Sequence, residues 1–86
     1  MHHNLKTVPR QFSPVYDEVK KSITRENDRG YQVGDTITLL EGWPSLEGFE
    51  TTGREVSARI IHLDDFGCQH GYVNLSLADV GMLIVE

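Results

Sequence analysis

Apolar side chains recur along the first quarter of the chain with the spacing of an α-helix. Four of them fall three and four residues apart on one helical face: Phe12, Val15, Tyr16 and Val19. Pro14 interrupts this pattern, because proline lacks a backbone N–H and crowds the carbonyl four residues earlier. We therefore expect a firm helix from about Ser13–Pro14 to Lys20, preceded by extended chain at Asn4–Thr7.

After residue 20 the spacing changes to an alternation of period two, which is typical of strands with one buried face. Strands are predicted at 22–24, 36–41, 54–63, 72–77 and 82–85. The side chains predicted to point inward are Ile37, Leu39, Val56, Ala58, Ile60, Val73, Leu75 and Leu77. Gly42–Thr52 is expected to be a loop, in which Trp43 and Phe49 cover the core or offer a stacking surface.

One helix followed by four or five short strands predicts an α+β fold. We expect a small, mostly antiparallel β-barrel with the one N-terminal helix packed at its end. With 86 residues, the chain is expected to form a single domain over 1–86. Its longest apolar run, Met82–Val85, is too short to cross a membrane, so no membrane association is expected. The lone cysteine, Cys68, cannot form an internal disulfide, which favours a cytoplasmic protein.

Charge is distributed unevenly along the chain. The net charge is −5, yet residues 1–34 carry a balance of +2 and residues 35–86 a balance of −7. Four of the eight basic residues lie in one polar stretch between residues 20 and 35: Lys20, Lys21, Arg25 and Arg29. This distribution predicts a small cationic site on an acidic body and excludes a broad phosphate-binding face.

Familiar chemical motifs are absent from the sequence. It contains no glycine-rich phosphate loop, no Cys/His spacing of a metal site and no Ser/His/Asp order. His62 and His70 are too isolated to form a metal pair. We therefore expect neither a metal nor a cofactor.

Several short blocks together resemble the ASCH domain of the PUA-like superfamily, and in particular its small phage and bacterial branch of uncharacterised function. The blocks are His3-Asn4-Leu5-Lys6-Thr7, Pro9, Phe12, Lys20, Arg25, the run from Asn27 to Asp35, Thr52-Gly53-Arg54 and Gly71-Tyr72-Val73. The resemblance implies a PUA-like barrel with a groove between the first helix and the barrel, where such domains are proposed to bind RNA. It also implies a hydrolase alternative, because a small bacterial relative is an amidohydrolase acting on acylated cytidine through a lysine, a threonine and a glutamate.

The resemblance and the local positive charge together define a candidate site for RNA or a nucleotide-sized ligand. Its predicted ligand-binding residues are His3, Lys6, Lys20, Arg25, Arg29 and Tyr31. An arginine offers a planar fork for a phosphate or a base edge, and a lysine supplies a mobile point charge. We expect the first four of these residues to converge on one concave surface, with Tyr31, Trp43 or Tyr72 available for stacking.

Two other functions stay open at this point. When the family's motif is aligned with this chain without a gap, the hydrolase threonine falls on Ile23. Isoleucine has no hydroxyl, so catalysis is not expected. A slip by one residue would recruit Lys21 and Thr24 but would displace Arg25 from its motif position. The motif glycine preceding this block falls on Glu18. The acidic second half would instead suit a phage-encoded adaptor or modulator that binds a host protein.

Overall fold

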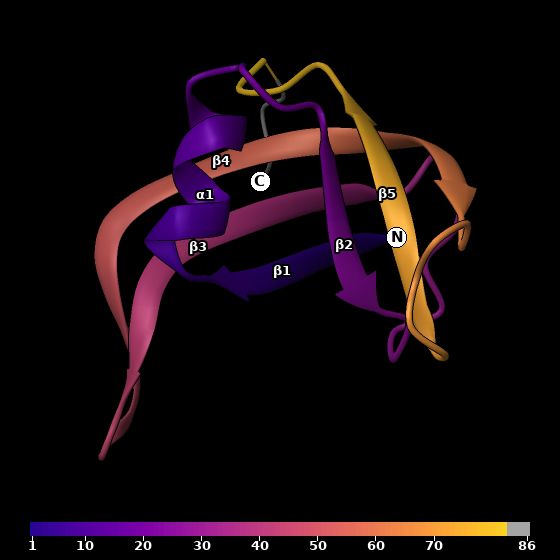
Figure 1. Ribbon diagram of the computed structural model, residues 1–86. Helices are drawn as coiled ribbons and strands as arrows, with labels where there is room; N and C mark the ends of the chain where they lie inside the picture. Colours follow the sequence, from indigo (N-terminus) through magenta and orange to yellow (C-terminus); the bar gives the residue numbers. More distant parts are fainter. Residues whose placement is uncertain (83–86) are drawn as a thin grey trace.

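The described part of the chain forms one curved, mixed sheet with a single short helix, as Figure 1 shows. The computed structural model describes residues 1–82. Its elements are β1 (His2–Thr7), α1 (Pro9–Tyr16), β2 (Ser22–Glu26), β3 (Thr36–Ser45), β4 (Gly48–Asp64) and β5 (Tyr72–Ala78). The strand order is β1-β3-β4-β5-β2, with β1 parallel to β3 and the other pairs antiparallel. The predicted α+β class and the mostly antiparallel sheet are confirmed.

The two edge strands, β1 and β2, are not hydrogen-bonded to each other, so the described part of the sheet is open rather than a closed barrel. Irregular pairing at Leu40–Gly42 and at Ile60–His62 bends the long strands β3 and β4. This curvature brings the two free edges near each other. Arg25 on β2 reaches across the opening and donates to Thr7 Oγ1 on β1 at 2.7 Å.

The inner face of the curved sheet carries the core. Of the eight side chains predicted to point inward, seven are buried, and Val73 is partly buried and packs against them. Phe12 and Val15 from α1 close one end of this core, and both are fully buried. The period-two prediction for the strands is therefore confirmed.

The predicted helix boundaries were wrong. α1 begins at Pro9 and ends at Tyr16, four residues before the expected end at Lys20. Glu18 adopts a left-handed conformation with φ of 59°, and the Val19 N–H bonds to the Pro14 carbonyl at 2.9 Å. This is a Schellman-type ending, which reverses the chain after the helix. Consequently Val19 is 82% exposed and Tyr16 is 43% exposed. The prediction that both side chains belong to the buried face of the helix was therefore wrong.

The loop predicted at Gly42–Thr52 was also wrong, because both long strands continue through it. β3 pairs with β4 as far as Ser45 and Gly48, which makes a projecting hairpin. We call residues 42–53 the β3–β4 arm. A side chain at Gly42 would collide with the Glu50 carbonyl and the Phe49 ring, so this close pairing depends on glycine.

β1 was expected only as extended chain, and its pairing with β3 was not predicted. The strand predicted at 82–85 lies outside the described residues, apart from Met82, which belongs to a turn. Within residues 1–82, no helix has the length and apolar character needed to cross a membrane.

Candidate functional site

A cleft of about 400 Å³ lies at the opening between the two edge strands. We call it the β1–β2 cleft. Its lining residues come from β1, α1, β2, the turn after β2 and the start of β5: Leu5, Lys6, Gln11, Thr24, Arg25, Glu26, Asp28, Arg29, Tyr31 and Tyr72. The cleft therefore joins segments that lie far apart in the sequence.

Arg25 is the most constrained charged side chain of the cleft. It shares the inward face of β2 with the buried Ile23, because alternate residues of a strand point the same way. Its Nη2 donates to Thr7 Oγ1, while the Thr7 hydroxyl donates to the Leu5 carbonyl at 2.9 Å. Burial lowers the pKa of the Arg25 guanidinium.

No carboxylate of residues 1–82 forms an ion pair with this partly buried charge, although Asp28 raises the pKa of Arg25 from a longer distance. Among residues 1–82, none of the ion pairs involves Arg25. Its Nε atom is buried and meets no hydrogen-bond acceptor in the same part of the chain. A guanidinium that has lost water without gaining a counterion favours an acceptor or an anion within reach.

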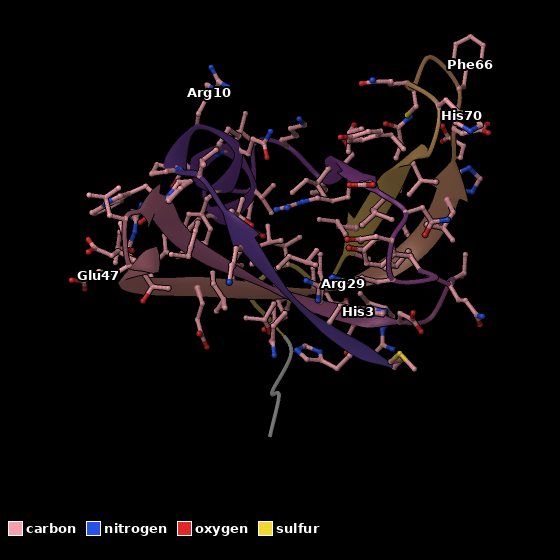
Figure 2. All side chains as sticks on the ribbon, turned by 90° about the horizontal axis from the view of Figure 1, so that it is seen from below. His3, Arg10, Arg29, Glu47, Phe66 and His70 are labelled. Atoms are coloured by element: carbon pink, nitrogen blue, oxygen red, sulfur yellow. The ribbon has the colours of Figure 1, made fainter. Side chains whose placement is uncertain are left out.

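Two further cations border the cleft. Arg29, which Figure 2 labels beside β1, donates from Nη1 to the Asn4 carbonyl at 3.0 Å. Its Nε lies 4.0 Å from Asp28 Oδ1, and both side chains are largely exposed, so this pairing is weak. Lys6 is exposed, and its Nζ lies 5.8 Å from the centre of the Phe49 ring. With Glu26 and Asp28 also lining the cleft, the local charge is +1.

Tyr31 and Tyr72 contribute the aromatic part of the lining. Tyr31 is only 5% exposed and meets the His3 ring edge-on, with 4.9 Å between the ring centres. Burial raises the pKa of the Tyr31 phenol. Tyr72 is partly exposed and offers the more accessible ring.

His3 lies behind the cleft rather than in it. As an inward residue of β1 it is 5% exposed, and its Nε2 lies 2.8 Å from Asp35 Oδ2. The Gln32 N–H donates to the same carboxylate oxygen at 3.1 Å. The hydrogen bond with His3 is the main cause that holds the pKa of Asp35 at about 2. This contact fastens the turn before β3 onto β1.

Four of the six predicted ligand-binding residues thus meet in the β1–β2 cleft: Lys6, Arg25, Arg29 and Tyr31. His3 and Lys20 do not line it. Lys20 follows the early end of α1, where its backbone N–H bonds to the Pro14 carbonyl. The expected convergence of both residues with Lys6 and Arg25 is not observed.

The residues of the hydrolase alternative lie in different surroundings. Ile23 is 3% exposed in the core. The Thr24 hydroxyl donates to Asn74 Oδ1 at 2.7 Å, and Lys21 is absent from the cleft lining. Glu41, an acid on the inner face of β3, is 4% exposed and is held by Arg54.

Sequence reasoning missed two contacts that shape the inner face of the sheet. Thr7 was not recognised as the partner of Arg25, although the alternation of His3, Leu5 and Thr7 placed it inward. Glu41 was not recognised as a buried acid, although it continues the inward series after Ile37 and Leu39. Polar residues at inward positions were the signal in both cases.

No three His, Cys, Asp or Glu side chains within residues 1–82 gather closely enough to hold a metal ion.

This chain is similar in sequence to known proteins over most of its length. Residues 2–77 match the family described as "Domain of unknown function (DUF3850)". The chain is also 38% identical over 63 residues to "Uncharacterized 12.9 kDa protein in GpA 3'region" of Escherichia phage P2. That match covers 73% of this chain and 54% of the phage protein, so the chain spans about half the length of this relative. The chain belongs to the family of the domain of unknown function DUF3850.

Proposed function

We propose that the β1–β2 cleft binds a nucleotide or a short stretch of single-stranded RNA. The observation that carries this proposal is the partly buried Arg25, which faces the cleft without a carboxylate partner among the described residues. A phosphate would supply the missing negative charge, and a phosphate or the acceptor edge of a base would accept a hydrogen bond from the guanidinium.

The charge of the cleft favours a small ligand over a long polyanion. Three cations and two carboxylates line it. A long RNA strand would gain few phosphate contacts there and would be repelled by the acidic remainder of the protein. A single nucleotide can instead place its phosphate near Lys6 or Arg29, and the donors of its base near Glu26 or Asp28.

The size and the aromatic lining support the same class of ligand. A volume of about 400 Å³ falls in the range of small-molecule sites. Tyr72 presents an accessible ring on which a base can stack, and such stacking tolerates different bases.

The proposal includes a fold assignment and a location. We propose that the sheet is a PUA-like barrel of ASCH type whose opening lies between β1 and β2. The proposed site of action is the cytoplasm, where a chain with one free cysteine remains reduced and where nucleotides and RNA are present.

Binding to the full chain tests the proposal. Labelled single-stranded RNA of a few nucleotides is followed by fluorescence anisotropy at low salt, and nucleoside monophosphates by calorimetry. Arg25→Met should weaken binding about tenfold or more, because it removes a partly desolvated charged donor. Arg29→Ala should weaken binding about two- to fivefold, because its side chain is more exposed.

Arg59→Ala is the matched control for Arg29→Ala. Both arginines are 45% exposed and each lies beside an aspartate, but Arg59 does not line the cleft. If a phosphate contacts Arg29, replacing Arg29 should also reduce the dependence of log affinity on log salt by about 0.7. Equal effects at Arg29 and Arg59, or no binding by the wild type, would contradict the proposal and favour the adaptor function.

Acylated cytidine belongs in the same ligand series. Because Ile23 is buried and Thr24 is bonded to Asn74, we expect no hydrolysis of this nucleoside. Turnover that is lost in a Lys21→Ala, Thr24→Ala variant would establish the hydrolase alternative instead.

A further inference from the structure

The β3–β4 arm carries two large apolar side chains in an exposed position. It extends beyond the last residue of β3 that pairs with β1, and Figure 1 shows it projecting from the rest of the sheet. Leu46 at its tip is fully exposed, and Trp43 is 47% exposed. Single exposed apolar residues are common, whereas a tryptophan and a leucine that share one projecting hairpin make a candidate contact surface.

The arm is an ordered hairpin. Its strands stay paired to the last residue before the turn, with Trp43 opposite Glu50 and Pro44 opposite Phe49. Within the turn, the Ser45 hydroxyl donates to the Gly48 carbonyl at 3.3 Å. An ordered hairpin presents its side chains to a partner without a large loss of conformational entropy.

The base of the arm is also anchored. The Phe49 ring covers the bare backbone at Gly42, and the Lys6 ammonium lies over that ring. These contacts tie the arm to β1, so the apolar tip is held at a defined position relative to the sheet.

The charge around the tip specifies the kind of partner. Residues 42–53 contain two acidic side chains, Glu47 and Glu50, and no basic one. Glu50 lies directly across the hairpin from Trp43. Acidic groups beside the apolar ones repel nucleic acid and the anionic face of a membrane, and they attract lysine and arginine.

We propose that the β3–β4 arm docks on a protein partner whose surface has an apolar pocket bordered by lysine or arginine. Leu46 enters the pocket, Trp43 covers its edge, and Glu47 and Glu50 pair with the basic border. This docking surface is separate from the β1–β2 cleft, since none of the four residues lines that cleft.

Site-specific photo-crosslinking of the full chain in the cells in which it naturally occurs identifies the partner. A photoreactive residue replaces Leu46 in one variant and Phe66 in the control. Phe66 is 88% exposed, and Figure 2 shows it at the opposite end of the molecule from Glu47, the neighbour of Leu46. We expect one crosslinked protein at position 46 that is absent at position 66.

Purified partner is then titrated against the full chain. Trp43 is the only tryptophan of the chain, so a blue shift of its fluorescence reports its burial, provided the partner's tryptophans are replaced or subtracted. Leu46→Ser and Trp43→Thr should each weaken the complex about tenfold or more. Replacing both Glu47 and Glu50 by lysine should also weaken the complex relative to the wild type. Phe66→Ser should leave the affinity unchanged.

The proposal is overturned by the same crosslinks at positions 46 and 66, by no crosslink at position 46, or by unchanged affinity of Leu46→Ser for the purified partner. A crosslinked dimer of the chain would identify a second copy as the occupant instead. A blue shift with lipid vesicles in the absence of partner would identify a membrane surface, and either result also refutes the proposal.

Discussion

Two arginines on the inner face of the sheet should differ in how much stability the protein loses when each is replaced by methionine. Arg25 makes one hydrogen bond, to Thr7, and joins no ion pair within residues 1–82. Arg54 holds both oxygens of Glu41, with donor–acceptor distances of 2.9 and 2.8 Å. Methionine keeps much of the apolar stem of each arginine and removes its charge.

The change at Arg25 should leave stability almost unaltered. Losing the bond to Thr7 costs about 1.5–3 kcal/mol for a charged donor. Removing the buried Nε, which has no acceptor among the described residues, recovers about 1–3 kcal/mol. No counterion is left behind, so the free energy of unfolding should change by about 1 kcal/mol or less. For a chain of this size, that corresponds to at most about 4–8 °C in Tm.

The change at Arg54 should be clearly more harmful. It leaves the Glu41 carboxylate, which is 4% exposed, without its counterion and with only the Thr52 hydroxyl as a side-chain donor within residues 1–82. The hydrogen bonds from Arg54 are the chief cause that lowers the pKa of Glu41. The change also removes the guanidinium that lies 4.8 Å from the Tyr16 ring centre and helps to hold α1 on the sheet. Breaking a pair by removing one partner is costly, because the remaining charge is left uncompensated.

Urea and thermal unfolding followed by circular dichroism at neutral pH measure both variants, and the binding assay is run on the same preparations. The expected result is a folded, near-wild-type Arg25→Met protein that binds ligand poorly, beside a destabilised Arg54→Met protein. If Arg25→Met costs about 3–5 kcal/mol, as expected on breaking a buried ion pair, Arg25 has a structural role and the argument from its missing partner fails.

Three further outcomes follow from the structure. Glu18→Gly should raise the free energy of unfolding by about 0.5–1 kcal/mol in urea titrations, because glycine removes the cost of the left-handed conformation while adding some unfolded-state entropy; a loss of stability would contradict this. Ile60→Ala should lower it by about 2–5 kcal/mol in the same assay, since Ile60 is fully buried, and a loss below 1 kcal/mol would place it outside the core. The folded pKa of Asp35, about 2, lies below its ordinary value of 3.8, so its contribution to stability is complete above about pH 4 and is lost as the pH falls toward 2. Acid titration of Asp35→Asn should therefore lack that loss, and an unchanged acid profile would refute the assignment.

The buried face of most strands was determined by the sequence alone. The alternation through Val56, Ala58 and Ile60 identifies the buried face of β4, because successive side chains of any strand point to opposite sides. The turn between Asn27 and Asp35 was also predictable from the sequence. Gly30 and Gly34 both adopt positive φ, a conformation that glycine reaches without steric cost.

The sequence also located the chemistry of the candidate site, but not its geometry. Lys6, Arg25 and Arg29 were recognised as cations that could serve one ligand. Whether they converge depends on where the edges of β1 and β2 meet, which no local pattern specifies. His3 had the right chemistry as well, but its position on the inward face of β1 paired it with Asp35 instead.

Only the tertiary structure decided the pairing of β1 with β3, the length of the β3–β4 arm and the bond between Glu41 and Arg54. Each depends on hydrogen bonds or packing between segments whose proximity is set by the whole fold. His2 and Thr36, for example, are neighbours across the sheet although 34 residues separate them in the chain. A periodic pattern shows which face of a helix or strand is apolar. Which other element packs or pairs with it depends on how the apolar faces of all elements can be buried together.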